Sequence, residues 1–334
     1  MFAMLMLPRL AHADGGVIAG SGCVVGGNPA VETTFYPDFE AWLGRDLPRI
    51  HTYLMSSPPN WMALENDYTN NAIPCLSLWA AQGKEINISV PMLVWGTTLL
   101  QGAQGDFDAE FVKLGTALVA AGLEKATLRI GWEFNGTWFF WAAKNDPADF
   151  IIYWRRIIAD FRSVKGQEFK FDWCSTWGSG AFQADEAYPG DDVVDYIGMD
   201  VYDSTFGGYQ NTPQQRWNYI TNTGHGLNWL VKFAALHHKL ITIPEWGTTS
   251  GPNGAGGVMY PGDDPYYFEQ MAAFFHDNKV AYQFLYDSDG TPGNYFINLA
   301  NFPNSAEQYR QSFGVVTPVN QNLVPPENTP QFAQ

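Results

Sequence analysis

Two glutamates stand where a folded chain often places chemistry. Glu133 directly follows the apolar run Leu128–Trp132, and Glu245 directly follows Leu240–Pro244, each with a turn-favouring glycine within three residues. Two converging carboxyl groups are what cleavage of a glycosidic bond needs. One, kept protonated by burial and by its neighbour's charge, protonates the leaving oxygen, and the other attacks the anomeric carbon. A single strand-end glutamate could equally pair with a cation, but two in matching context favour catalysis.

The elements that must position these carboxyls are short β-rich runs separated by helical patterns. One helical stripe starts at Asp146-Pro147, and another starts at Asp264-Pro265, with Asp as N-cap and Pro at the first helical position. Strands are expected near Gly16–Ala19, Arg49–Met55, Asn87–Val94, Ala126–Trp132, Lys170–Ser175, Tyr196–Val201, Leu240–Pro244 and Val280–Tyr286. Eight strands alternating with helices predict an α/β fold, a (β/α)8 TIM barrel, with an open doubly wound sheet as the alternative. In a barrel, Glu133 and Glu245 end strands four and seven, which face each other across the barrel.

The chain has no interdomain linker or internal repeat, so we expect one catalytic barrel over residues 14–316. Residues 317–334 are rich in Pro, Asn and Gln and predict an extended or disordered tail. The segments 182–195 and 250–264 are rich in Gly, Pro and Asp and follow predicted strands. A barrel places such loops on its active face.

Composition excludes several classes of protein. The 334 residues contain 18 Lys and Arg against 34 Asp and Glu, a net charge of −16, which disfavours nucleic acid and anionic membrane surfaces. No run approaches the roughly 20 apolar residues of a membrane span. Aromatic residues make up 16% of the chain and could form core or sugar-stacking surfaces. No Cys/His cluster has metal-ligand spacing, and Asp287-Ser-Asp289 lacks the closing Glu of a calcium loop, so we expect no metal and no cofactor.

The N-terminus and the cysteines bear on the compartment. Residues 1–13 are largely apolar and end in Ala11-His12-Ala13, similar to a signal-peptidase site, although a positive n-region is missing. We interpret them as a signal-peptide remnant, the alternative being an ordinary frayed terminus, and expect a secreted or periplasmic protein. Cys23 and Cys75 lie in loop-like surroundings and could pair after export, whereas Cys174 is expected to be a buried thiol.

Four segments carry a family resemblance. The run from Arg129 through Glu133 to Trp141 resembles the acid/base signature of glycoside hydrolase family 26, a family of retaining barrel enzymes that includes β-mannanases. Three further segments are similar to family motifs and occur in the family's order: Phe39–Arg45, Val194–Asp203 and Pro244–Gly247.

The resemblance implies roles for individual residues. Glu133 would be the acid/base and Glu245 the nucleophile, with Tyr202 donating a hydrogen bond to the nucleophile. Arg129, four positions before Glu133 and therefore expected on the same face of its strand, would hold Glu245 ionised. Trp138 would stack on a sugar beside Glu133.

Other candidate substrate-binding residues have two interpretations. Asn135 is either a sugar contact or a residue that shapes the loop. Trp177 and Trp246 are either core residues or stacking platforms, and their positions just past strand ends favour platforms. Trp132 stands where the family has His, and Tyr286 stands near the usual Trp of strand eight. Both departures touch the subsite that selects the sugar, so a β-linked polymer other than mannan, such as a bacterial exopolysaccharide, is also a candidate.

The sequence therefore predicts a retaining, endo-acting β-glycoside hydrolase that acts as a monomer on polysaccharide or oligosaccharide. A catalytically silent barrel that only binds polysaccharide is the alternative from another class. An α/β oxidoreductase on an open sheet is a third hypothesis, and it would require bound nicotinamide or flavin.

Overall fold

The computed structural model describes residues 14–19, 29–178, 182–205, 212–252, 259–287 and 301–314. Each of the eight expected strands is present, with ends that differ by a few residues from the predicted ones. In chain order they are β1 (Asp14–Ala19), β2 (Arg49–Tyr53), β3 (Glu85–Val90), β4 (Thr127–Ile130), β5 (Lys170–Thr176), β6 (Tyr196–Tyr202), β7 (Leu240–Gly247) and β10 (Tyr282–Asp287).

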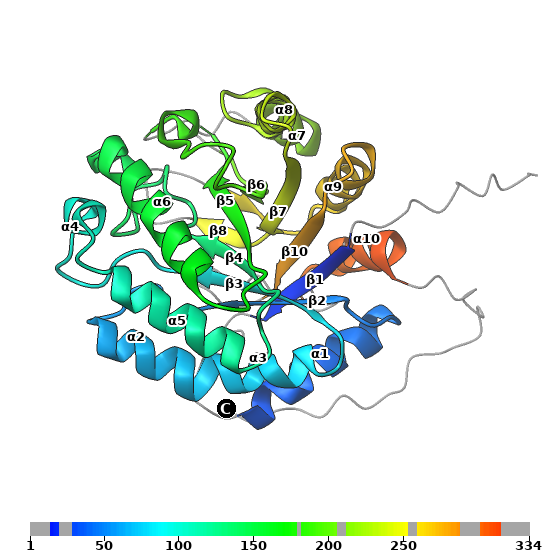
Figure 1. Ribbon diagram of the computed structural model, residues 1–334. Helices are drawn as coiled ribbons and strands as arrows, with labels where there is room; N and C mark the ends of the chain where they lie inside the picture. The colour runs from blue at the N-terminus through cyan, green and yellow to red at the C-terminus, as the bar shows by residue number, and fades with distance from the viewer. Residues whose placement is uncertain are drawn as a thin grey trace, which may run out of the picture.

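These strands form one parallel sheet that closes on itself. Its order is β1-β10-β7-β6-β5-β4-β3-β2, and β1 and β2 at the two ends contact each other. The order follows the chain around a ring and never reverses, as it would at the centre of a doubly wound sheet. The (β/α)8 barrel is confirmed (Figure 1).

Helices surround the strands (Figure 1). The predicted starts of α6 and α9 are confirmed, because Asp146 and Asp264 accept hydrogen bonds from backbone N–H groups of the first helical turn. The α-helices are α1 (Pro29–Leu43), α2 (Trp61–Asp67), α3 (Ile73–Ala80), α4 (Leu99–Gln104), α5 (Asp108–Ala120), α6 (Pro147–Ser163), α7 (Pro213–Asn222), α8 (Leu227–Leu236), α9 (Pro265–Asp277) and α10 (Pro303–Phe313). Short helical segments of other types are a π-helix over Tyr68–Ala72 and 3₁₀-helices over Ala143–Asn145 and Ala184–Ala187. None of the helices in the described ranges is both long and apolar enough to cross a bilayer.

The two faces of the sheet carry different kinds of buried side chain. Between strands and helices lies an apolar layer rich in aromatic rings, for example Phe161, Trp173 and Phe275. The inside of the barrel instead carries buried polar side chains that bond to one another: His51, Ser89, Arg129, Asp172, Asp200 and Thr242. A buried polar interior is stable only when its groups are paired, so this network fixes the relative positions of the strands.

Other predictions from the sequence concern the segment 250–264, the cysteines and the two ends of the chain. Segment 250–264 is not wholly a loop, because β8 (Ser250–Pro252) and β9 (Met259–Pro261) pair antiparallel within it. Cys75 is disulfide-bonded, and Cys174 is a free buried thiol, as expected. Cys23, the expected signal remnant 1–13 and the expected tail 317–334 lie outside the described residues.

A buried ionic cluster ties the end of β6 to two helices. Arg216 of α7 donates to Asp203 through Nε, at 2.8 Å, and to Asp264, the N-cap of α9, through Nη2. All three side chains are almost fully buried. One cation faces two carboxyls, and burial together with Asp264 raises the pKa of Asp203 to about 8.

This cluster predicts that stability falls as pH rises. Asp203 keeps its proton up to about pH 8 in the folded chain but releases it near pH 4 when unfolded. The free energy of unfolding therefore falls by up to about 1.4 kcal/mol for each pH unit between those values. Asp203→Asn should flatten this dependence in urea unfolding at pH 5 to 8. Asp192→Asn, at an exposed pair with Arg155, should retain the wild-type slope. An unchanged slope in Asp203→Asn would contradict this prediction.

Candidate active site

Glu245 faces the barrel interior because β7 contains an extra residue. Thr242 points inward, donating to the buried Asp172 at 2.8 Å, so strict alternation would turn Glu245 outward. The register with β6 passes from Gly198↔Thr242 to Asp200↔Glu245, which is two residues on β6 against three on β7. The pairing with β10 shifts in the same place. Pro244 lies within this bulge, where its missing N–H costs no ladder bond.

Three side chains from three strands contact the Glu245 carboxylate. Tyr202 of β6 donates to Oε1 at 2.5 Å, and Tyr53 of β2 donates to Oε2. Arg129 of β4 approaches Oε2 with Nη1 at 3.4 Å. The Glu245 side chain remains 12% exposed, so the carboxylate is held in place while part of it still meets solvent.

Glu133 reaches the site through a turn. The strand ends at Ile130, and both Gly131 (φ 57°) and Glu133 (φ 51°) adopt left-handed backbone conformations. The Glu133 N–H donates to the carbonyl oxygen of Cys174 on β5 at 2.9 Å. Strand alternation was expected to place Glu133 on the same face as Arg129, and this explanation is wrong. The turn and the hydrogen bond to β5 determine the position of Glu133. At Gly131 a Cβ would lie 2.3 Å from the Met92 Sδ, so a larger residue would have to displace this buried side chain and adopt a strained backbone.

The surroundings of Glu133 favour its protonated form. Burial raises its pKa to about 7, with the charge of Glu245 as the second cause, although hydrogen bonds from Trp138 and Thr176 act in the opposite direction. The indole Nε1 of Trp138 donates to Oε2 at 2.7 Å. Glu133 and Glu245 are thus electrostatically linked, as two carboxyls that divide acid and nucleophile roles must be.

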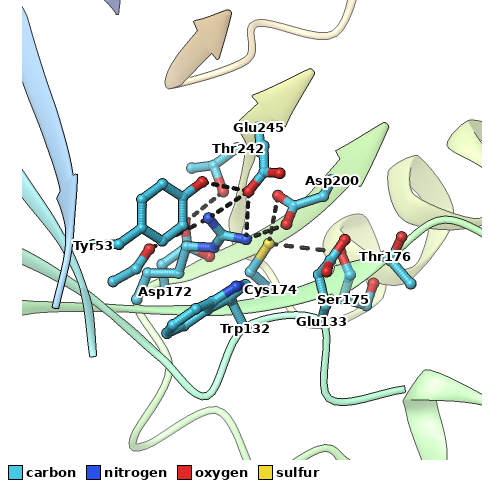
Figure 2. Close-up of polar contacts among 12 residues, drawn as sticks. Tyr53, Trp132, Glu133, Asp172, Cys174, Ser175, Thr176, Asp200, Thr242 and Glu245 are labelled. Atoms are coloured by element: carbon cyan, nitrogen blue, oxygen red, sulfur yellow. Dashed lines mark hydrogen bonds and ion pairs between the residues drawn. The ribbon is translucent and has the colours of Figure 1, made fainter. Parts of the chain in front are cut away.

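Arg129 is a cation inside the barrel, and its side chain is only 1% exposed. Its main partner is Asp200 of β6, with which it forms a close ion pair, and Glu245 is its second partner. The predicted Arg129–Glu245 contact is present, but the sequence interpretation did not assign Asp200. Figure 2 shows Asp200, Glu245 and Cys174 converging on this network.

The predicted sugar-contacting aromatic residues separate into exposed and buried ones. Trp138 is 58% exposed beside Glu133, and Tyr286 is half-buried with its ring 6.1 Å from that of Tyr202. By contrast, Trp177 is buried at the end of β5, and Trp132 is buried between Tyr53 and Phe139. The burial of Trp177 therefore favours its core interpretation over the stacking platform, and the burial of Trp132 makes it a packing residue rather than the expected substrate contact.

Trp246 and Asn135 also have structural roles. Trp246 is fully buried outside the barrel, packs on Phe268 and Phe275 of α9 and donates to Gln283 at 2.5 Å. A ring without exposed surface cannot stack on a sugar, so its expected platform role is wrong. The same bulge that turns Glu245 inward turns Trp246 outward. The amide of Asn135 bonds both N–H and C=O of Thr176, each at 2.8 Å, which agrees with the loop-shaping interpretation.

Besides Asp200, sequence reasoning also missed Tyr53. It is the last residue of β2, and alternation places it on the same face as the inward-facing His51. A polar aromatic residue at the carboxyl end of a barrel strand was the available signal. No group of three or more His, Cys, Asp or Glu side chains in the described ranges is arranged to hold a metal ion.

A model of a known protein family matches part of the chain. Residues 126–224 match the model of glycosyl hydrolase family 26. None of the curated protein sequences compared with the chain matches it. The matched segment includes Arg129, Glu133 and Tyr202, whereas Glu245 lies beyond it.

Solved structures share the fold at low identity. The catalytic domain of a family 26 endo-β-1,4-mannanase from Bacillus sp. JAMB-750 is 17% identical, with a TM-score of 0.66 over 92% of this chain and 88% of that one. A family 26 β-mannanase from Bacteroides ovatus is 15% identical, with a TM-score of 0.61 over 91% and 88%. A β-mannanase from a symbiotic protist of the termite Reticulitermes speratus, solved with gluco-manno-oligosaccharide, is 15% identical, with a TM-score of 0.58 over 92% and 88%.

The fold and the site define a glycoside hydrolase on a (β/α)8 barrel. The match over residues 126–224 confirms the resemblance to glycoside hydrolase family 26 that the motifs predicted.

Proposed function

We propose that this chain is a retaining, endo-acting hydrolase of a β-linked polysaccharide. One observation carries the proposal: Glu245 is held by Tyr202 and Arg129, while the linked Glu133 has a pKa raised to about 7. One carboxyl is thus arranged to attack and the other to donate a proton near neutral pH. Double displacement requires the two groups about 5–5.5 Å apart, which is the distance we predict.

The residues support a two-step reaction. In the first step Glu245 attacks the anomeric carbon, the glycosidic C–O bond breaks, and the Glu133 proton passes to the leaving oxygen. The resulting ester removes the charge of Glu245, which is the second cause of the raised Glu133 pKa, so the acidity of Glu133 increases. Glu133, now ionised, takes a proton from water, which attacks the anomeric carbon and releases Glu245 as a carboxylate.

For the substrate we propose a β-mannan or a related β-linked polymer. The similar structures are named as β-mannanases, and one was solved with gluco-manno-oligosaccharide, which supports mannose- and glucose-containing backbones. Trp132, in place of the family's His, leaves one polar sugar contact fewer, so other β-linked polymers such as exopolysaccharides belong in the test.

We also propose that the protein is exported, with residues 14–316 as a single catalytic barrel acting as a monomer. The disulfide at Cys75 supports export, because disulfides persist in oxidising compartments.

Product analysis tests the proposal. Galactomannan, glucomannan, β-glucan and a bacterial exopolysaccharide should be incubated with the protein, with mass analysis of products and proton NMR of the first anomer formed. We expect oligosaccharides of several lengths in which the β-anomer appears first. An initial α-anomer would contradict retention. Tight binding without cleavage of any polymer would favour the silent binding barrel.

A further inference from the structure

Tyr53 of β2 contacts Glu245, the proposed nucleophile, although the two-step reaction described above assigns no role to β2. Its hydroxyl group donates to Oε2 of Glu245, and Figure 2 shows the two side chains facing each other. A carboxylate oxygen only accepts, so the phenol is the donor. Burial and the adjacent Glu245 raise the pKa of Tyr53 well above 10, and it therefore stays protonated through the working pH range.

The ring of Tyr53 is fixed by its neighbours. It stacks on His51 at 5.0 Å between ring centroids and meets the edge of Trp132 at 5.5 Å. The Arg129 guanidinium carbon lies 5.9 Å from the ring centroid. His51 is itself buried and bonded to Ser89 at 2.8 Å. The hydroxyl is therefore held at one place, and Trp132 acquires a role as part of its support.

The two carboxylate oxygens of Glu245 accept different numbers of hydrogen bonds. Oε2 receives the Tyr53 hydroxyl and both terminal nitrogens of Arg129, at 3.4 and 3.5 Å. Oε1 receives the Tyr202 hydroxyl. A carboxylate oxygen has two lone pairs, so the donors of Tyr53 and Arg129 occupy Oε2, and Oε1 keeps a lone pair for a new bond.

We infer that Tyr53 is a positioning residue that anchors Oε2 and so makes Oε1 the attacking oxygen of Glu245. This inference rests on the proposed retaining function. It also implies that the hydrogen bond from Tyr53 accelerates the second step of the reaction more than the first. Charge leaves the carboxylate when the ester forms and returns when water displaces it, so the bond from Tyr53 strengthens during hydrolysis of the intermediate.

Tyr53→Phe tests this inference with two probes, 2,4-dinitrophenyl β-mannobioside and 2,4-dinitrophenyl β-cellobioside. Their leaving group needs little proton donation, so the kinetics report on Glu245. We expect a burst of dinitrophenol followed by a steady rate about 10- to 100-fold below wild type, as loss of a bond to a charged group implies. KM should fall together with kcat, and the glycosyl-enzyme should be visible by intact mass.

Tyr282→Phe is the matched control. It removes another phenol that donates to a carboxylate, Asp172, inside the same barrel without touching Glu245. It should retain the wild-type KM, burst and steady rate, whereas a general loss of barrel packing would slow both variants alike.

The outcomes separate the inference from the proposed function. Tyr53→Phe kinetics equal to wild type, or a lower kcat at unchanged KM without a burst, would overturn the role of Tyr53 alone. An equal loss of the steady rate in both variants would assign the effect to barrel packing and overturn it as well. A folded wild-type protein inactive on both probes and on the polymers would overturn the proposed function, and the inference with it.

Discussion

Replacing Glu245 by alanine should reduce polysaccharide hydrolysis by about 10⁴-fold or more, since removal of a nucleophile eliminates the covalent route. The variant should remain folded, because Arg129 keeps its close ion pair with Asp200. The measurement is reducing-sugar release from the most active polymer of the panel. Added azide should restore cleavage of a dinitrophenyl glycoside and yield the α-glycosyl azide, because azide then occupies the space of the missing carboxylate.

Glu186→Gln serves as the control, since Glu186 is an exposed glutamate of a short helical segment following β5. It should retain wild-type rates. Full activity in Glu245→Ala would exclude Glu245 as the nucleophile, and a β-glycosyl azide would show that azide does not attack from the side of Glu245.

Glu133→Gln has the second-largest expected effect, and the size of that effect depends on the leaving group. On polymer, loss of the proton donor should lower kcat/KM by about 10²- to 10⁴-fold. On a dinitrophenyl glycoside the first step should be nearly unaffected, because this leaving group departs without protonation. Comparison of the two substrates under identical conditions is the measurement, and an equal loss on both would contradict the acid role.

The pH dependence of the wild type follows from the same carboxyl. The pKa of Glu133 is raised to about 7, and the first step needs its proton, so kcat/KM on polymer should fall as pH rises through about 7. Glu133→Gln should lack this alkaline limb, because glutamine does not titrate. Persistence of the limb in the variant would assign it to another group.

The barrel could be predicted from the sequence because its strands are short apolar runs punctuated by turns and helix caps. Asp146-Pro147 and Asp264-Pro265 gave helix starts for a local physical reason, the side-chain cap. Strand order then followed from alternation with helices. Local patterns of this kind are fixed within a few residues, so a single sequence is sufficient to show them.

The direction in which individual side chains point could not be predicted in the same way. The register shift in β7 reverses inside and outside for Glu245 and Trp246, and it is defined by pairing with β6 and β10. Glu133 depends on a left-handed turn tied to Cys174 of another strand. Tyr53 acquires its role only when β2 and β7 belong to one ring. These properties arise from contacts distant in sequence.

The extra residue in β7 sets a limit for anyone who wishes to redesign this enzyme. Shortening the strand by one position between Thr242 and Trp246 would exchange the directions of a carboxylate and an indole, placing a charge in the aromatic layer and a large ring in the polar interior. Selectivity for a new sugar should therefore be sought in exposed side chains such as Trp138, whose replacement leaves the strands intact although it removes the hydrogen bond to Glu133.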